Sequence, residues 1–274
     1  MQFTVQPSVL FALYTNTIKK EIRSKTIIFV FLLNLGLIFV VNSGIDLIIK
    51  SVEEQNLLNL HGQKAVVFYF LINIWCTVLS VIFGVDCIKS DVETGVASLL
   101  MAQPLRRWWY LLMRILGATT IVFGHYLLSI ILAGIIFYIS DGTSHLDVQI
   151  IGALFATLLV NIAVITLSAL ISLSLNKLVA FIITMVGCTI ISLANQAFIA
   201  DDLMYHIKNL GLAKIIGLLA HYLLPRIGVW SSFASSLVSG KTPSINYTWE
   251  IPHYGITLLG LFFVLSFLFS RKEL

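Results

Sequence analysis

The sequence predicts an all-α integral membrane protein with six transmembrane helices, and two observations carry this prediction. Of the 274 residues, 58% are hydrophobic and only 11% are charged, whereas about a quarter of residues carry charge in a typical soluble domain. Six stretches contain no Lys, Arg, Asp or Glu and reach the roughly 20 residues that a helix needs to cross a bilayer core. Consecutive apolar residues such as 27–31 do not fit the alternating pattern of a membrane β-barrel.

The whole chain, 1–274, is predicted to form one transmembrane domain, because no segment is polar enough for a soluble catalytic domain. The first span follows a leader without a clear cleavage pattern, so we expect it to be retained rather than removed as a signal peptide. Three cysteines, Cys76, Cys87 and Cys188, lie in or beside apolar stretches without metal-binding spacing. The spans are predicted at about 26–45, 65–86, 110–140, 148–176, 178–200 and 252–270.

The distribution of cations predicts that both termini are cytoplasmic. Loops rich in Lys and Arg stay on the inner side of a bacterial membrane. With the N-terminus inside, eleven cations lie on the inner side and six on the outer side, and those six lie in the two longest loops, where the rule is weakest. The inner set is Lys19, Lys20, Arg23, Lys25, Lys89, Arg106, Arg107, Arg114, Lys177, Arg271 and Lys272.

Residues 8–25, ahead of the first span, are predicted to form an amphipathic helix at the membrane interface. Apolar residues recur at helical spacing, and most of the cations lie off that stripe. The alternative is a solvated leader whose stripe arises by chance. The stripe consists of Leu10, Leu13, Tyr14, Ile18 and Ile22.

Between the second and third spans, acids are followed by a short apolar run, a proline and basic residues. Ser90 and Glu93 have the spacing of a capping box, which predicts that a short helix begins there, at roughly 93–103, and that Pro104 ends it. Arg106, Arg107 and the aromatic residues after them suit the headgroup region where the third span begins. The alternative interpretation is that Asp91 and Glu93 form an ordinary solvated turn.

The segment 201–251 is predicted to be a long outer loop. Two apolar stretches inside it, 215–225 and 227–240, are too short to cross a bilayer. We therefore expect re-entrant or interfacial helices between the fifth and sixth spans.

Searches for catalytic motifs give no candidate, so the chain is not predicted to be an enzyme. Residues 239–242, Ser-Gly-Lys-Thr, imitate the end of a phosphate-binding loop, but Ser235 replaces the required glycine and Pro243 opposes the following helix. There is no His-Glu-x-x-His metal motif and no nucleophile elbow in the sequence. His206, His221 and His253 match no metal-ligand spacing, and no metal is expected.

Polar side chains inside the predicted spans are candidates for a translocation path, because a bilayer makes such groups costly. His125 is ionisable within the third span, and the other candidates are amides. The competing explanation is ordinary hydrogen bonding between helices. The amides are Asn73, Asn161, Asn195 and Gln196.

The segment 91–107 resembles the corresponding loop of the ABC-2 type transporter permeases, the membrane-spanning subunits of bacterial ATP-binding-cassette exporters. It has acids, a Thr-Gly step, paired leucines, a proline and basic residues. Lys20, Glu21, Ile22 and Arg23 are similar to that family's N-terminal motif, and the tail 271–274 is similar to its C-terminal end. The resemblance implies an ATPase-coupling loop at Asp91, Glu93, Gly95, Leu99, Leu100, Pro104, Arg106 and Arg107.

The resemblance implies a permease in the bacterial inner membrane that exports a drug, peptide, lipid or ion. Its expected partners are two copies of a cytoplasmic ABC ATPase, a second copy of itself or a related permease, and membrane lipids, without nucleic acid. No cofactor is expected on this chain, because ATP and Mg²⁺ belong to the ATPase. The alternatives are a membrane anchor that transmits force or signal without transport, and a transporter or intramembrane enzyme that works alone.

Overall fold

A computed structural model describes residues 7–23, 25–53, 61–102, 105–142, 149–200, 211–242 and 245–272, and these ranges are helical without a β-strand. Six of the described helices are long and apolar enough to cross a membrane, which confirms the predicted fold class at this level and makes the chain a multi-pass membrane protein. They are α2 (Thr26–Glu53), α3 (His61–Glu93), α5 (Arg107–Asp141), α6 (Gln149–Ser174), α7 (Lys177–Ala200) and α11 (Tyr247–Arg271).

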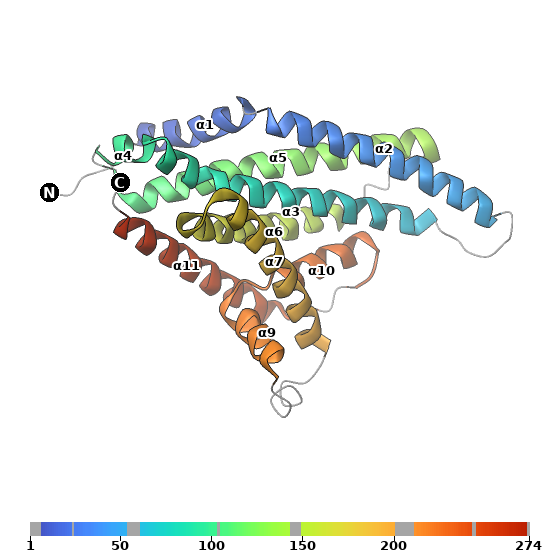
Figure 1. The fold of residues 1–274 in the computed structure, drawn as a ribbon. Helices are drawn as coiled ribbons and strands as arrows, with labels where there is room; N and C mark the ends of the chain where they lie inside the picture. The colour runs from blue at the N-terminus through green and yellow to red at the C-terminus, as the bar shows by residue number, and fades with distance from the viewer. Residues whose placement is uncertain are drawn as a thin grey trace.

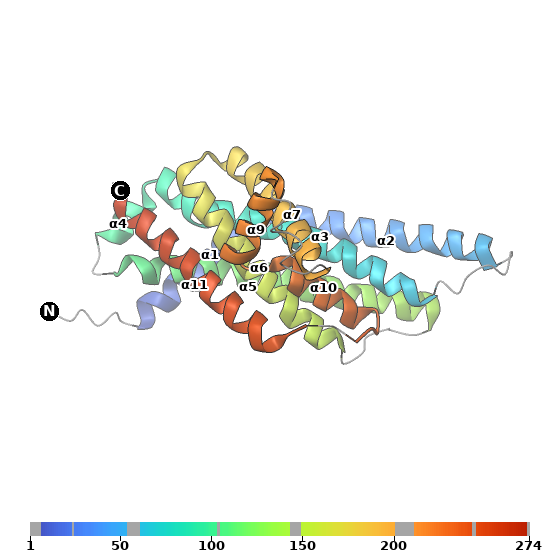
Figure 2. The same cartoon turned by 90° about the horizontal axis from the view of Figure 1, so that it is seen from below.

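Each of these helices coincides with a predicted span, but several continue past the apolar stretch. α2 reaches Glu53 rather than residue 45, α3 reaches Glu93 rather than residue 86, and α11 begins at Tyr247 instead of residue 252. Hydrophobicity marks only the part of a helix that crosses the bilayer core, whereas backbone hydrogen bonds extend the helix into polar surroundings. In both ribbon views α2 extends furthest from the end of the bundle where α4 lies (Figures 1 and 2).

The shorter α1 (Pro7–Arg23) lies close to its predicted range of 8–25 and packs on α5. Its buried residues are Leu13, Thr17 and Glu21, which lie four residues apart on one face. The approach to α5 is close: a Cβ added to Gly117 would lie 2.7 Å from the Cβ of Thr17. From Leu13 to Glu21, one face of α1 is therefore buried against the bundle.

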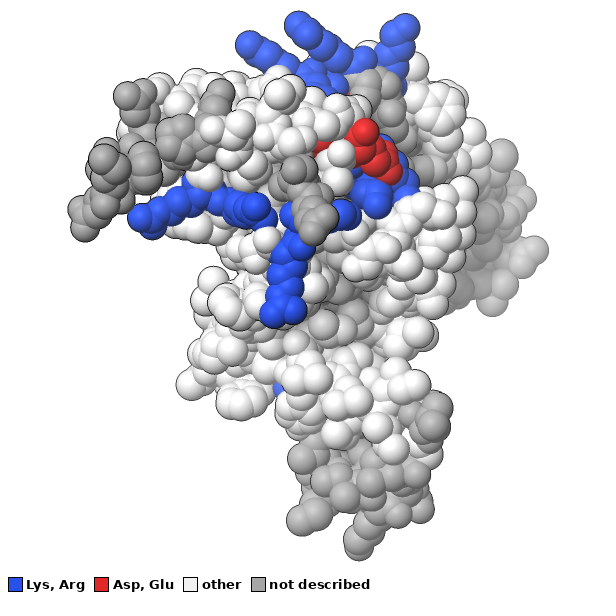
Figure 3. Space-filling model, turned by 60° about the vertical axis from the view of Figure 1, so that its left-hand side comes forward, with Lys and Arg blue, Asp and Glu red and all other residues white. Residues whose placement is uncertain are grey.

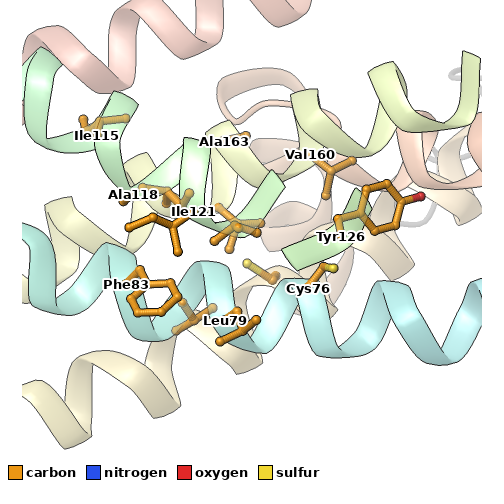
Figure 4. Packing of buried hydrophobic residues seen from close by; sticks show 14 of the residues in the cluster. Cys76, Leu79, Phe83, Ile115, Ala118, Ile121, Tyr126, Val160 and Ala163 are labelled. Carbon is orange, nitrogen blue, oxygen red and sulfur yellow. The ribbon is translucent and has the colours of Figure 1, made fainter. Parts of the chain in front are cut away.

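The core of the bundle lies between α3, α5 and α6 (Figure 4). Cys76, Leu79 and Phe83 of α3 face residues of α5 and α6, and all three are nearly inaccessible to solvent. A Cβ on Gly84 would lie 2.7 Å from the carbonyl oxygen of Ile165, so the backbones of α3 and α6 nearly touch. Small residues at helix crossings give dispersion contacts, which matter most in a bilayer, where the hydrophobic effect does not hold helices together.

Two short apolar helices follow α7, where the sequence predicts a loop with re-entrant or interfacial helices. They are α9 (Leu212–Leu223) and α10 (Ile227–Val238), and both are shorter than a span. α10 packs on α6 and α7: a Cβ on Gly152 would lie 2.9 Å from Leu237, and one on Gly228 would lie 2.8 Å from the Ser192 carbonyl oxygen. Residues 201–210 and 243–244 lie outside the described part of the chain.

Candidate functional site

The segment predicted to couple to an ATPase is a turn and a short helix at one end of the bundle. α3 ends at Glu93, Thr94 and Gly95 form a turn, and α4 (Val96–Met101) follows. Gly95 has φ of +73°, a left-handed conformation that glycine adopts without steric cost. Its N–H donates to the Val92 carbonyl oxygen at 3.3 Å, which closes the end of α3.

The capping-box interpretation of Ser90 and Glu93 is wrong. Both residues lie in the last turn of α3, and α4 begins at Val96, after Gly95. The helical pattern of apolar residues in α3 ends before residue 90. The sequence alone therefore did not reveal that the helix continues to Glu93. The predicted stop, Pro104, lies outside the described residues.

The outer surface of α4 is apolar and accessible. Leu99 is 74% exposed, Val96 and Glu93 are also exposed, and Leu100 is half-buried against the core. Ala97 is fully buried and fixes the opposite face of the short helix against the bundle. α4 therefore presents Val96 and Leu99 outward while Ala97 anchors it to the bundle.

Below this turn, Asp91 is the centre of a buried set of charges. Its carboxylate forms an ion pair with Arg114 of α5, and it also pairs with Lys20 of α1 at 3.3 Å. Tyr110 donates its hydroxyl hydrogen bond to Asp91 Oδ2 at 2.7 Å. Arg114 in turn donates from Nη1 to Thr17 Oγ1 at 2.9 Å. Asp91 therefore joins the last turn of α3 to both α1 and α5, and the interpretation of Asp91 as a solvated residue is wrong.

A second acid, Asp86, joins the same helices to α7. Lys177 Nζ lies 2.6 Å from Asp86 Oδ1 and 3.2 Å from Glu93 Oε2, and Lys20 Nζ lies 3.8 Å from Asp86 Oδ2. We call these residues the α4-end network. Its members are Lys20, Asp86, Asp91, Glu93, Tyr110, Arg114 and Lys177.

Basic residues near the network bond to the ends of two further helices, α6 and α11. Arg107 Nη1 donates to the Ser270 carbonyl oxygen at 2.5 Å, and Lys272 Nζ donates to the Leu173 carbonyl oxygen at 2.7 Å. These contacts bring together α5, α11 and α6, while Arg106 is exposed where α5 begins. Figure 3 brings this end of the molecule forward and shows Lys and Arg side chains spread over it.

Asn73, predicted to face a translocation path, lines a cavity of about 420 Å³ between α3, α6, α7 and α10. We call it the Asn73 cavity. None of the lining residues that the structure describes is charged, and the volume is in the range of small-molecule sites. Its polar lining groups come mainly from the hydroxyl residues Thr77, Thr189, Ser192 and Ser231.

The other predicted path residues do not line this cavity. His125 is buried with Asn34 of α2, whose amide nitrogen donates to Ser129 Oγ at 2.8 Å and lies 3.5 Å from His125 Nε2. Asn161 is buried too, and no described residue bonds its side-chain amide. His125 thus contacts α2, and Asn34 is a partner that the sequence analysis did not name.

Asn195 belongs to a second polar cluster, which joins α7, α9, α10 and α11. His221 Nδ1 donates to Asn195 Oδ1 at 3.0 Å. Arg226 donates to Glu250 Oε1 at 2.6 Å and to the His221 carbonyl oxygen. Burial, with a smaller contribution from Arg226, lowers the pKa of His221 to about 4, so it is neutral near pH 7. Gln196, the adjacent candidate, is exposed.

This second cluster was not predicted, because Arg226 and Glu250 appear in the sequence as charges of an outer loop. In the structure Arg226 is 4% exposed and Glu250 is 8% exposed, and their pair holds α10 to α11. The only sequence signal is that both lie beside apolar stretches.

Together, the fold and these clusters define a multi-pass helical membrane protein with a charge network at one end and an uncharged cavity between α3, α6, α7 and α10. The chain matches none of the family models against which it was compared, and no curated protein matches its sequence.

Proposed function

We propose that this chain is the membrane-spanning subunit of a bacterial ATP-binding-cassette exporter, with the α4 end in the cytoplasm. A separate ATPase subunit, in two copies, would dock at α4, and two permease copies would form the transport path. The proposal rests on the likeness of segment 91–107 to ABC-2 permeases, and one structural observation supports it most directly. The end of α3, which leads directly into the exposed α4, is joined by ion pairs to α1, α5 and α7.

The route from α4 into the membrane is short. Residue 93 ends one spanning helix and residue 107 begins the next, so displacement of α4 acts directly on α3 and α5. Asp91 is held by Lys20 and Arg114, which makes α1 move with these two helices. Lys177 connects Glu93 to the start of α7. Rigid elements that are linked in this way transmit a local push as a movement of whole helices.

The consequence for transport lies in the Asn73 cavity. α3 and α7 both line this cavity. The last turns of α3 and the first residue of α7 belong to the α4-end network. Movement of α3 relative to α7 therefore changes the cavity that an uncharged or weakly polar substrate would occupy. Asn73, Thr77 and Ser192 offer it hydrogen bonds without requiring a charge.

The first test is purification of the chain from its native membrane in mild detergent, followed by mass spectrometry and an ATPase assay. The proposal expects a stoichiometric partner with an ATP-binding cassette. A Leu99→Ser variant should lose this partner, because Leu99 is the most exposed residue of α4, while Leu223→Ser, exposed on α9, should keep it. Repeated absence of an ATPase from intact preparations would contradict the proposal.

Transport itself needs a second experiment, because an anchor that transmits force or signal would also bind an ATPase. In vesicles that contain the purified complex, ATP-dependent substrate accumulation supports an exporter. Filling the Asn73 cavity with Ser192→Phe should stop accumulation while ATPase binding remains. If ATP is hydrolysed and no candidate substrate moves, the anchor explanation is favoured.

A further inference from the structure

A second cavity, of about 480 Å³, lies at the α4 end between α1, α3 and α7. Glu21 from α1 and Asp86 from α3 line it together with Lys177 from α7. We call it the Glu21 cavity. It shares no described lining residue with the Asn73 cavity, which is formed in part by α10.

The remaining walls of the Glu21 cavity are hydrocarbon. They are contributed by Ile82, Phe83, Val85, Leu178 and Phe181. Leu178 is 68% exposed, so the cavity opens on the outer surface of α7. It lies where α7 begins and where the apolar part of α3 gives way to charged residues, which is the level of lipid headgroups.

The charged groups on the wall favour a cation. Two of the three ionisable lining residues are carboxylates. The third, Lys177, already bonds to Asp86 at 2.6 Å and to Glu93 at 3.2 Å. An anionic group would meet two carboxylates at the wall, whereas an ammonium group can donate hydrogen bonds to both.

A metal ion is the less suitable cation. No group of three or more His, Cys, Asp or Glu side chains gathers in the described part of the chain. Ca²⁺ prefers six to eight oxygen ligands and Mg²⁺ retains water in a polar site, which the apolar walls do not supply. An organic cation with a hydrocarbon tail satisfies both the carboxylates and the walls.

We propose that the Glu21 cavity binds an amphiphile with an ammonium head and an apolar tail. The ammonium group lies between Glu21 and Asp86, and the tail lies along Phe83, Leu178 and Phe181. This site does not depend on the proposed exporter function, because binding requires neither an ATPase nor transport.

Glu21 also makes the proposed site sensitive to pH. It is 3% exposed, and burial raises its pKa from the ordinary 4.5 to about 7. Lys20 on the same helix and Arg114 of α5 oppose this increase, whereas Asp86 and Asp91 of α3 add to it. Cys87 of α3 also interacts electrostatically with Glu21, and Lys177 of α7 lines the same cavity. Lys19 of α1 and Lys89 and Glu93 of α3 are further charged residues of the helices that form this cavity. A proton and an ammonium group therefore compete for the Glu21 carboxylate.

The test measures the affinity of a fluorescent alkylamine for the purified full chain in discs of phosphatidylglycerol, which has no amine, with empty discs as the blank. The amine stays protonated near neutral pH. We expect saturable binding that is about tenfold tighter at about pH 8 than at about pH 6, because one proton competes with the ligand. The matched alkyl alcohol and the alkyl carboxylate should bind at least about tenfold more weakly.

Two kinds of variant distinguish the contribution of the Glu21 charge to binding from the contribution of the cavity volume. Glu21→Gln should lower the affinity for the amine at about pH 8 by about tenfold and remove the pH dependence. Ile82→Trp should fill the cavity and weaken binding, while Leu259→Trp, 69% exposed on α11, should not. Equal binding of amine and alcohol, or an unchanged Glu21→Gln variant that is still folded by thermal unfolding, would overturn the proposal.

A final measurement identifies the natural source of the ammonium group. Lipid extracted from the chain purified out of native membranes should contain aminophospholipid in wild type and less in Glu21→Gln if the ligand is a membrane lipid. If the lipids of the two preparations match while the alkylamine still binds, the ligand is a free lipophilic amine. Absence of both signals contradicts the proposal.

Discussion

At the scale of single residues, Asp91 and Arg114 depend on each other because neither charge is solvated. The side chains are 5% and 1% exposed, and they form an ion pair. Two buried charges lose most of their hydration, and only close pairing with additional hydrogen bonds offsets this cost. Tyr110 and Thr17 provide those hydrogen bonds at 2.7 and 2.9 Å.

Replacing one member of this pair should therefore be costly. Asp91→Asn leaves Arg114 buried beside a neutral amide and should destabilise the protein by about 3 to 5 kcal/mol. The double variant Asp91→Asn with Arg114→Met removes both charges. It should recover part of the stability that Asp91→Asn loses. Thermal unfolding in detergent measures both. A double variant less stable than Asp91→Asn alone would show that the charges do not act as a pair.

Glu21 should make stability fall as pH rises. Its pKa is raised by burial from 4.5 to about 7, so the folded chain holds a proton that the unfolded chain releases. The contribution to stability is fully present below about pH 4.5 and is lost as pH rises to about 7, by roughly 2 to 3 kcal/mol. Unfolding of wild type and Glu21→Gln across this range is the measurement. The difference between them should change with pH, and parallel curves would contradict the raised pKa.

At the scale of elements, the turn before α4 depends on one backbone conformation. Gly95 has φ of +73° and donates its N–H to Val92, and proline can do neither. Gly95→Pro should tilt α4 and uncouple ATP hydrolysis while the spanning helices still fold. Gly142, which follows the last residue of α5, provides the control. It has φ of +72° and donates its N–H to the Tyr138 carbonyl oxygen. Gly142→Pro should leave coupling intact, as measured by substrate-stimulated ATPase activity.

Glu93→Ala tests the same element through a side chain. Glu93 and Lys177 pair at 3.2 Å with side chains 46% and 40% exposed, and such exposed pairs contribute less than about 1 kcal/mol to stability. The variant should therefore fold normally and lose ATPase coupling. Normal coupling in a folded Glu93→Ala protein would remove Glu93 from the transmission route.

The contact between α1 and α5 depends on the absence of a side chain at Gly117. A Cβ there would lie 2.7 Å from Thr17, so Gly117→Val should force α1 away and cost about 1 to 3 kcal/mol. Gly124 lies two turns further along α5 with no atom within 4 Å of an added Cβ. Gly124→Val changes the helix propensity by the same amount as Gly117→Val. It should therefore lower the stability clearly less, because no close contact is disturbed. Thermal unfolding of the two variants makes the comparison, and equal losses would contradict close packing.

At the scale of the whole molecule, the sequence predicts the spans well because crossing a bilayer needs a long apolar helix whatever its neighbours are. The six spans and the short helices near 8–25, 215–225 and 227–240 follow from local composition. The ends of α2, α3 and α11 do not, since polar residues can extend a helix beyond the bilayer. Glu93 was assigned to a new helix for this reason, although α3 continues through it.

The partners within each site could not be predicted, because they come from distant parts of the chain. Asp91 was singled out from its local pattern, but Lys20 lies 71 positions away. Asn34 and His125 are 91 positions apart. Without the packing of helices, Arg226 and Glu250 also look like loop charges rather than a buried pair. Local sequence identifies the helices, and the packing of the helices decides which side chains contact each other.

The orientation of the bundle is a property of the whole molecule that labelling can measure. Eleven cations at the α4 end predict that it faces the cytoplasm, where an ATPase could reach α4. Leu99 and Lys241 are both exposed, and the predicted topology places them on opposite sides of the membrane. The native Cys76, Cys87 and Cys188 are buried and should react slowly.

With a maleimide that cannot cross membranes, Lys241→Cys should therefore react in intact cells, and Leu99→Cys should react only after the membrane is permeabilised. The unsubstituted chain measures the background from the buried cysteines, and labelling in detergent confirms that both introduced thiols are accessible. The reverse pattern would place α4 outside, away from ATP, and the exporter proposal would fail. The ammonium site would remain testable, because its binding requires only the folded chain.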